Sequence, residues 1–221
     1  MVLVKNTVFS KYTGIAVAIL GPLLYSLIIG PLAIKPAVMP STYALIGFAF
    51  YWILTLSLFS DTMHKNNGYP WKFRISRRMV YLAIVIGVAL SLLVPLFTHI
   101  AEQFLPAADS GGIFDTTAQF SPWIILLGVV TAGVTEEFIF RAYIIERLQT
   151  LSVSTWLCAA ISIVSFVLAH MSGWNLTHIL GVVLPMAVIL TGLYLWQRNV
   201  TFVIIIHTTI DLPLFFITLG N

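Results

Sequence analysis

The chain has 221 residues, of which 59% are hydrophobic and only 9% are charged, and its formal net charge at neutral pH is +3. Soluble domains carry about 25% charged residues, so this composition excludes an ordinary water-soluble globular protein. The small positive charge does not indicate nucleic-acid binding, because the basic residues lie in short connections between apolar runs. The single cysteine, Cys158, excludes an internal disulfide. The sequence therefore predicts a polytopic membrane protein.

Apolar segments of the length needed to cross a bilayer, about 17 to 25 residues, recur along the whole chain. In chain order they are Tyr12–Ile34, Thr42–Ser60, Met79–Ile100, Pro122–Ile145, Ser154–His170, Leu176–Trp196 and Val200–Leu219. The first is too long for the apolar core of a signal peptide, so we interpret it as a span. We predict an all-α fold: a transmembrane helical bundle of about seven or eight spans with a polar intramembrane cavity.

The domain organisation is predicted to be simple, because the sequence contains neither an internal repeat nor a low-complexity tract. Residues 1–221 are expected to form one integral-membrane domain. Within it, residues 1–121 hold N-terminal spans whose role the sequence does not indicate, and residues 122–219 hold the spans that carry polar motifs.

The connections between the segments differ in charge. The connection Asp61–Arg78 holds five basic residues, whereas Glu102–Ser121 holds three acidic residues and no basic one. Arg147, Arg198 and the N-terminal lysines are expected on the same side as the first connection, with Lys35 as an exception. Positive charge marks the cytoplasmic side, so we predict that the N-terminus and the cavity face the cytoplasm. The absence of organellar targeting signals favours a prokaryotic plasma membrane.

Ionisable side chains nevertheless occur inside the later spans. They are Glu136, Glu137, Arg141, His170, His207 and Asp211. A charged side chain at the bilayer centre costs about 2.5 to 3.5 kcal/mol on insertion scales, and such residues mark functional sites by default. These six are therefore the candidate site residues.

Helical spacing separates the two adjacent glutamates. Glu137 and Arg141 are four residues apart, so they share one face of a helix and can pair. Glu136 is rotated from Glu137 by roughly 100° and has no partner on its own helix. His207 and Asp211 also share one helical face. If these groups converge, a carboxylate can take a proton from water while imidazoles hold the water and stabilise an oxyanion, which is the chemistry of amide hydrolysis.

Three motifs follow one another in the late segments. E-E-x-x-x-R covers Glu136–Arg141, F-x-x-x-H covers Phe166–His170, and H-x-x-x-[N/D] covers His207–Asp211. Together they resemble the CAAX protease and bacteriocin-processing family, also called the Abi family, which includes the type II CAAX prenyl endopeptidases. The resemblance extends over about Pro122–Leu219. It implies an intramembrane endopeptidase that acts on a membrane-associated peptide or protein tail, with the lipid bilayer as a partner and no predicted oligomeric state.

The resemblance also implies a role for each candidate. Glu136 becomes the general base that activates water, assisted by His170, while Glu137 and Arg141 orient the site and balance its charge. His207 and Asp211 become the oxyanion site. Asp stands where Asn is expected in the eukaryotic-type enzymes, and an ionised Asp cannot donate a hydrogen bond to an oxyanion. Asp211 can instead orient His207 or be protonated, and prenyl specificity stays open.

Three other interpretations stay open at the level of the sequence. No cofactor is predicted to be required, but zinc held by Glu136, His170 and His207 is the chemical alternative, although no H-E-x-x-H pair is present. A second interpretation is a non-catalytic membrane protein for bacteriocin immunity or partner binding. A third is a proton-coupled transporter, because buried Glu and His residues also form proton relays.

Overall fold

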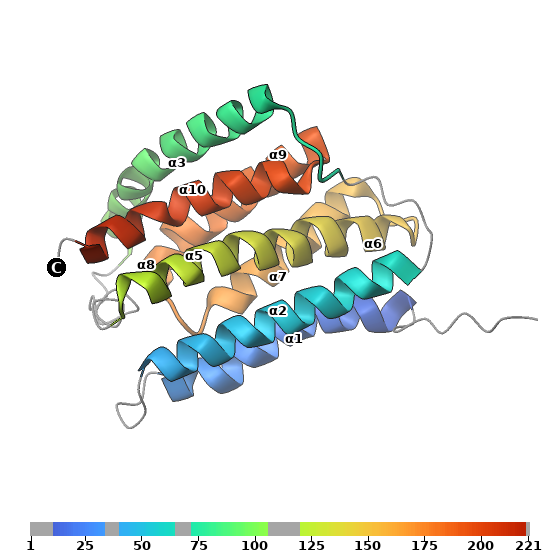
Figure 1. The fold of residues 1–221 in the computed structure, drawn as a ribbon, viewed down its shortest axis with the longest axis horizontal. Helices are drawn as coiled ribbons and strands as arrows, with labels where there is room; N and C mark the ends of the chain where they lie inside the picture. The colour runs from blue at the N-terminus through green and yellow to red at the C-terminus, as the bar shows by residue number, and fades with distance from the viewer. Residues whose placement is uncertain (1–10, 34–39, 65–71, 106–119, 220–221) are drawn as a thin grey trace, which may run out of the picture.

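The computed structural model describes residues 11–33, 40–64, 72–105 and 120–219, and within these ranges the chain forms helices and no β-strand (Figure 1). The elements are α1 (Lys11–Ala33), α2 (Pro40–His64), α3 (Arg77–Phe104), α5 (Pro122–Glu136), η1 (Glu137–Ile145), α6 (Glu146–Gln149), α7 (Thr155–His170), α8 (Leu176–His178), η2 (Ile179–Val183), α9 (Leu184–Gln197) and α10 (Val200–Leu219). Each of the seven predicted segments coincides with one helix or with a run of consecutive helical elements.

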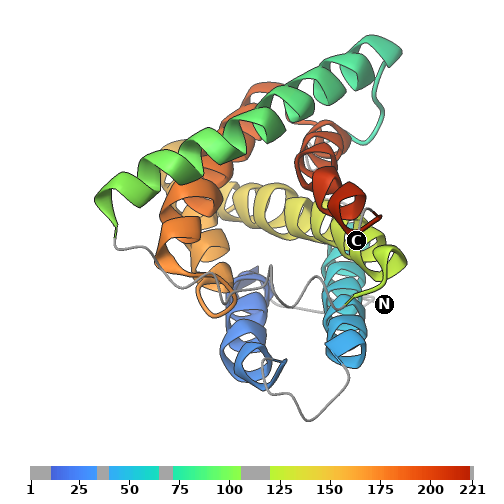
Figure 2. The ribbon, with the colours of Figure 1, turned by 90° about the vertical axis from the view of Figure 1, so that its left-hand side faces the viewer.

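The described helices confirm an all-α integral membrane protein. Five of them are long and apolar enough to cross a membrane: Ser41–Met63, Arg77–Phe104, Pro122–Gln149, Leu176–Gln197 and Val200–Leu219. Two more, Tyr12–Ile28 and Thr155–His170, are apolar but shorter. The predicted count of seven or eight spans is therefore not confirmed. Seen from the end of the bundle, α1 and α2 lie at one edge and α3 at the opposite edge (Figure 2).

Several helix ends follow from local side-chain chemistry. Ser76 precedes α3 and accepts a hydrogen bond from the backbone N–H of Met79, at 3.3 Å. Asn175 precedes α8 and accepts one from the backbone N–H of His178, at 2.8 Å. Such caps satisfy N–H groups that have no partner inside the helix. The left-handed backbone of Arg198, with φ of 48°, ends α9.

The helix that carries the first motif changes its winding at the motif itself. α5 is an α-helix up to Glu136, and the next nine residues form the π-helix η1, all of them buried. The hydroxyl of Ser162 on α7 donates to the carbonyl oxygen of Phe140, at 2.7 Å, and so gives that carbonyl a partner. Short π-helical stretches are frequent at functional sites. The predicted span Pro122–Ile145 covers α5 and η1, but the helix continues through α6 to Gln149, and the change of winding was not predicted.

Small residues bring α10 close to its two neighbours. A Cβ atom added to Gly133 of α5 would collide with the side-chain hydroxyl of Thr208, and one added to Gly87 of α3 would lie 2.6 Å from Cβ of Thr209. The absence of side chains at both positions lets the backbones approach, as small residues do between membrane helices. Because Glu136 follows Gly133 by one turn and His207 precedes Thr208, this approach sets those two residues side by side.

The end of the bundle opposite the C-terminus carries a buried network of charges. The sequence placed Asp61 and Arg147 in connections, but Asp61 lies inside α2 and Arg147 inside α6, and both are fully buried. The pair survives burial because each charge has partners: Nη2 of Arg147 lies 3.4 Å from Oδ2 of Asp61, which also accepts a hydrogen bond from the Tyr143 hydroxyl. Nearby, the partly exposed Arg198 pairs with the buried Glu146.

The backbone confirms that the basic connection and Arg198 lie together. The N–H of Lys72 donates to the carbonyl of Arg198, and the N–H of Val200 donates to the carbonyl of Lys72, both at 3.0 Å. Lys5, Lys35, Lys65, Asp109 and Asp115, on which the orientation argument also rests, lie outside the described residues. The cytoplasmic orientation and the division at residue 121 therefore stay predictions.

Candidate active site

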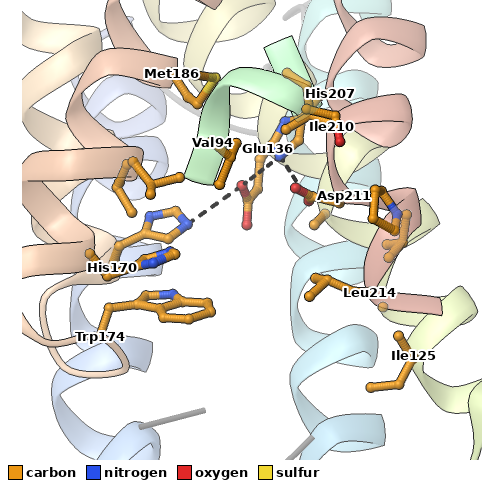
Figure 3. Close-up of a pocket in the computed structure, with 18 of the residues that line it drawn as sticks. Val94, Ile125, Glu136, His170, Trp174, Met186, His207, Ile210, Asp211 and Leu214 are labelled. Carbon is orange, nitrogen blue, oxygen red and sulfur yellow. Dashed lines mark ion pairs between the residues drawn. The ribbon is translucent and has the colours of Figure 1, made fainter. Parts of the chain in front are cut away.

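Three of the predicted residues meet around one carboxylate oxygen. Oε2 of Glu136 lies 3.8 Å from Nε2 of His170 and 4.0 Å from Nε2 of His207 (Figure 3). The three side chains come from the end of α5, the end of α7 and the middle of α10. The structure thus brings together groups that are up to 71 residues apart in the chain, as the hydrolysis hypothesis requires.

Glu137 lies on the other side of the His207 ring from Glu136 and contacts two groups. Its Oε1 lies 3.0 Å from a guanidinium nitrogen of Arg141 and 2.7 Å from Nδ1 of His207. The Glu137 and Arg141 side chains are completely buried. The predicted pair of Glu137 with Arg141 is therefore present. The contact with His207 was not predicted, since nothing in the local sequence links residues 70 positions apart.

Both imidazoles are anchored through Nδ1. The Nδ1–H of His170 donates to the backbone carbonyl of Phe166, at 2.8 Å. Glu137 is paired with Arg141 and accepts as a carboxylate, so the Nδ1–H of His207 donates to it. Each ring consequently presents Nε2 to Glu136, and fixing one ring nitrogen in this way determines what the other can do.

Phe166 packs the first two motifs against each other. The guanidinium carbon of Arg141 lies 4.3 Å from the centroid of the Phe166 ring, within range of a cation–π contact. The centroid of the His170 ring is also 4.3 Å from that of Phe166, with the planes tilted by 31°. The phenylalanine of F-x-x-x-H therefore positions the arginine of the first motif and the histidine of the second.

Asp211 contacts the nitrogen of His207 that faces the cluster. Its Oδ2 lies 3.3 Å from Nε2 of His207, which confirms the shared helical face. The Asp211 side chain is more exposed than its partners, at 29% against 9% for His207. Glu137 and Asp211 thus hold the two ends of one imidazole ring.

A cavity of about 590 Å³ opens on the cluster and is lined by Glu136, His170, His207 and Asp211 together with mostly apolar side chains. The walls come from α2, α3, α5, α10 and the region from α7 to α9. Its volume is in the range of cavities that bind organic ligands, about 300 to 1,000 Å³. A polar cavity was predicted and is not confirmed, because the polar groups are gathered in one part of an apolar space.

Sequence reasoning missed one residue of this cavity. His178 falls within the predicted span Leu176–Trp196 and was not a candidate site residue, but it lines the cavity and stacks on Trp174, with ring centroids 3.9 Å apart. The Asn175 cap at the start of α8 fixes this turn of the chain. Asn175 is the local sequence signal for the turn, but no motif marks His178 itself.

The side chains of Glu136, His170 and His207 bear on the alternative of a zinc site. Imidazole nitrogens and a carboxylate oxygen are suitable zinc ligands in kind. Over residues 11–33, 40–64, 72–105 and 120–219, no group of three or more His, Cys, Asp or Glu side chains is arranged to hold a metal ion. A site that requires no metal therefore stays the prediction, with zinc at Glu136, His170 and His207 as the alternative that chelation can test.

The C-terminal part of the chain also matches a known protein family. Residues 118–213 match the family described as "Rce1-like: Type II CAAX prenyl endopeptidase Rce1-like". No curated protein and no solved structure matches the chain. The matched region contains all six candidate site residues and agrees with the resemblance drawn from the three motifs. The match to the Rce1-like family over residues 118–213 thus confirms the resemblance to CAAX proteases for the part of the chain that carries the three motifs.

Proposed function

We propose that this protein is an intramembrane endopeptidase that cleaves a peptide bond in a membrane-associated peptide or protein tail with water activated by Glu136. The observation that carries the proposal is the position of one carboxylate oxygen between two imidazole nitrogens, at 3.8 and 4.0 Å, on the wall of the large cavity. Polar groups at such separations are commonly bridged by water.

The first step places that water. A water oxygen about 2.8 Å from both Oε2 of Glu136 and Nε2 of His170 subtends an angle of about 85°, which suits two hydrogen bonds. The water gives one proton to the Glu136 carboxylate, and its oxygen attacks the carbonyl carbon of the substrate. Glu136 then passes the proton to the leaving nitrogen as the C–N bond breaks. General-base assistance of this kind contributes about 10² to 10⁴ in rate.

The second step concerns the negative charge on the carbonyl oxygen. We assign its stabilisation to the Nε2–H of His207, because Glu137 fixes the opposite side of that ring. An imidazole that donates through both nitrogens is positively charged, and Glu137 and Asp211 balance that charge. Nε2 carries one hydrogen, so in this proposal Asp211 accepts it before the reaction and the oxyanion accepts it in the transition state, while Asp211 makes no direct contact with the oxyanion.

The substrate is expected to be apolar near the cleaved bond. The mostly apolar walls of a 590 Å³ cavity suit a peptide that carries a lipid or large apolar side chains. The family description adds a prenylated protein tail as the first substrate to test. The proposal requires no metal. No observation on the described residues favours bacteriocin immunity or proton-coupled transport over proteolysis.

The test uses purified full-length protein in detergent micelles or liposomes, with prenylated and palmitoylated peptides as substrates and mass spectrometry as the readout. Glu136→Gln and His170→Ala are expected to lower kcat by at least about a hundredfold. Glu102→Gln on α3 is the control, because Glu102 is exposed and does not line the cavity. Folded Glu136→Gln and His170→Ala proteins that cleave as fast as the parent would refute the proposal.

A further inference from the structure

A second, smaller cavity of about 200 Å³ also reaches Glu136, from between α1, α2 and α5. The two cavities share the lining residues Ala44, Phe48, Gly128, Ala132 and Glu136. The two cavities are therefore neighbours that share part of a wall, and the candidate base lines both of them. The catalytic steps proposed above use only the larger one.

The shape of the smaller cavity depends on glycines that face aromatic rings. A Cβ atom on Gly128 would lie 3.0 Å from Cζ of Phe48, so these two residues close the gap between α5 and α2. A Cβ atom on Gly47 would collide with the hydroxyl of Tyr25. The hydroxyl end of the Tyr25 side chain therefore lies against Gly47, and Tyr25 forms the wall on the α1 side.

Neighbouring contacts hold this wall in place. Tyr25 stacks on Phe50, with centroids 4.7 Å apart and planes inclined by 15°, and meets the edge of Tyr51 at 5.7 Å. On the α5 side, the indole N–H of Trp52 donates to the hydroxyl of Thr131 at 3.1 Å, which ties α2 to α5. The cavity is thus bounded by packed aromatic rings and by an interhelical hydrogen bond.

We propose that the smaller cavity is a subsite for the side chain of a residue that flanks the cleaved bond, with Tyr25 setting the size of side chain it accepts. The volume is below the range of about 300 to 1,000 Å³ that holds whole ligands, so one amino-acid side chain is the matching occupant. In an extended peptide, successive side chains point to opposite faces. A peptide lying across Glu136 therefore directs one neighbour to the large cavity and the other to the small one. This inference rests on the proposed function.

The experiment combines variants of Tyr25 with a series of peptide substrates. Farnesylated peptides carry Ala, Val, Leu, Phe or Trp at each of the two positions beside the cleaved bond, varied separately, and cleavage is followed by mass spectrometry. Tyr25→Ala widens the cavity and is expected to raise the Phe-to-Ala ratio of kcat/KM at one position by at least about tenfold. Tyr25→Trp narrows it and is expected to lower the same ratio by a similar factor.

Tyr12 supplies matched controls on the same helix. It is 73% exposed and lines neither cavity, so Tyr12→Ala and Tyr12→Trp are expected to leave the ratio within about twofold. Tyr25→Leu replaces Tyr25→Ala if the latter does not elute as a single species in size-exclusion chromatography. A parent that cleaves the peptides, with Tyr25 variants that keep its ratio at both positions, overturns the subsite alone. A parent that cleaves none of the peptides overturns the proposed function and the subsite with it.

Discussion

The two adjacent glutamates are predicted to respond in opposite ways to the same substitution. Oε1 of Glu137 contacts Arg141 at 3.0 Å and His207 at 2.7 Å, and its side chain is completely buried. Glu136 has its nearest charged partners at 3.8 Å or more and retains 12% exposure. Glu137→Gln therefore leaves the buried charge of Arg141 without its partner, whereas Glu136→Gln removes a carboxylate that no close ion pair holds.

The expected magnitude follows from that difference. Breaking a buried ion pair by removing one partner costs about 3 to 5 kcal/mol. For a chain of this size each kcal/mol shifts Tm by about 2 to 4 °C, so Glu137→Gln is expected to lower Tm by roughly 6 to 20 °C. Glu136→Gln is expected to lower kcat by about 10² to 10⁴ and to leave Tm within a few degrees of the parent.

The assay combines two measurements on the same preparations. Thermal unfolding in detergent gives Tm at a fixed scan rate, and cleavage of a prenylated peptide gives kcat. Activity alone does not separate the two residues, because Glu137→Gln also releases the ring of His207. The reasoning is refuted if Glu136→Gln destabilises the protein as much as Glu137→Gln does, or if Glu137→Gln leaves Tm unchanged.

Three further predictions use the same peptide assay. His207→Ala is expected to lower kcat by about 10² to 10³, whereas Asp211→Asn keeps it within about tenfold, and equal losses would contradict the separate roles. EDTA and 1,10-phenanthroline are expected to leave kcat unchanged, and a loss that added zinc restores would favour the metal alternative. Gly133→Ala is expected to cost about 1 to 3 kcal/mol of stability and to reduce activity, with partial recovery in a double variant with Thr208→Ala. A Gly133→Ala protein with the parent's Tm and kcat would show that close packing of α5 on α10 does not set the site.

The positions of the helices could be predicted because the signal is local. A run of about 20 apolar residues specifies a membrane helix whatever surrounds it, and each predicted segment coincides with helical structure. The ends of the helices were predicted less accurately. For example, α2 continues beyond Ser60, and Asp61 is buried within it. A charged residue near the end of an apolar run is normally assigned to a loop. Asp61 is buried instead because it pairs with Arg147, and the sequence did not predict that contact. The winding of η1 was not predictable from the apolar pattern, which does not distinguish an α-helix from a π-helix.

The sequence by itself determined the class of the molecule, the candidate residues and the pairs four positions apart, because composition and helical spacing are properties of neighbouring residues. Glu137 with Arg141 and His207 with Asp211 are pairs of this kind. Only the tertiary structure decided that Glu136 lies between two imidazoles, that Glu137 holds His207, and that one carboxylate lines two cavities. Those contacts depend on how closely α5, α7 and α10 approach, and that approach depends on side chains such as Gly133 and Phe166 packing across helices far apart in the chain.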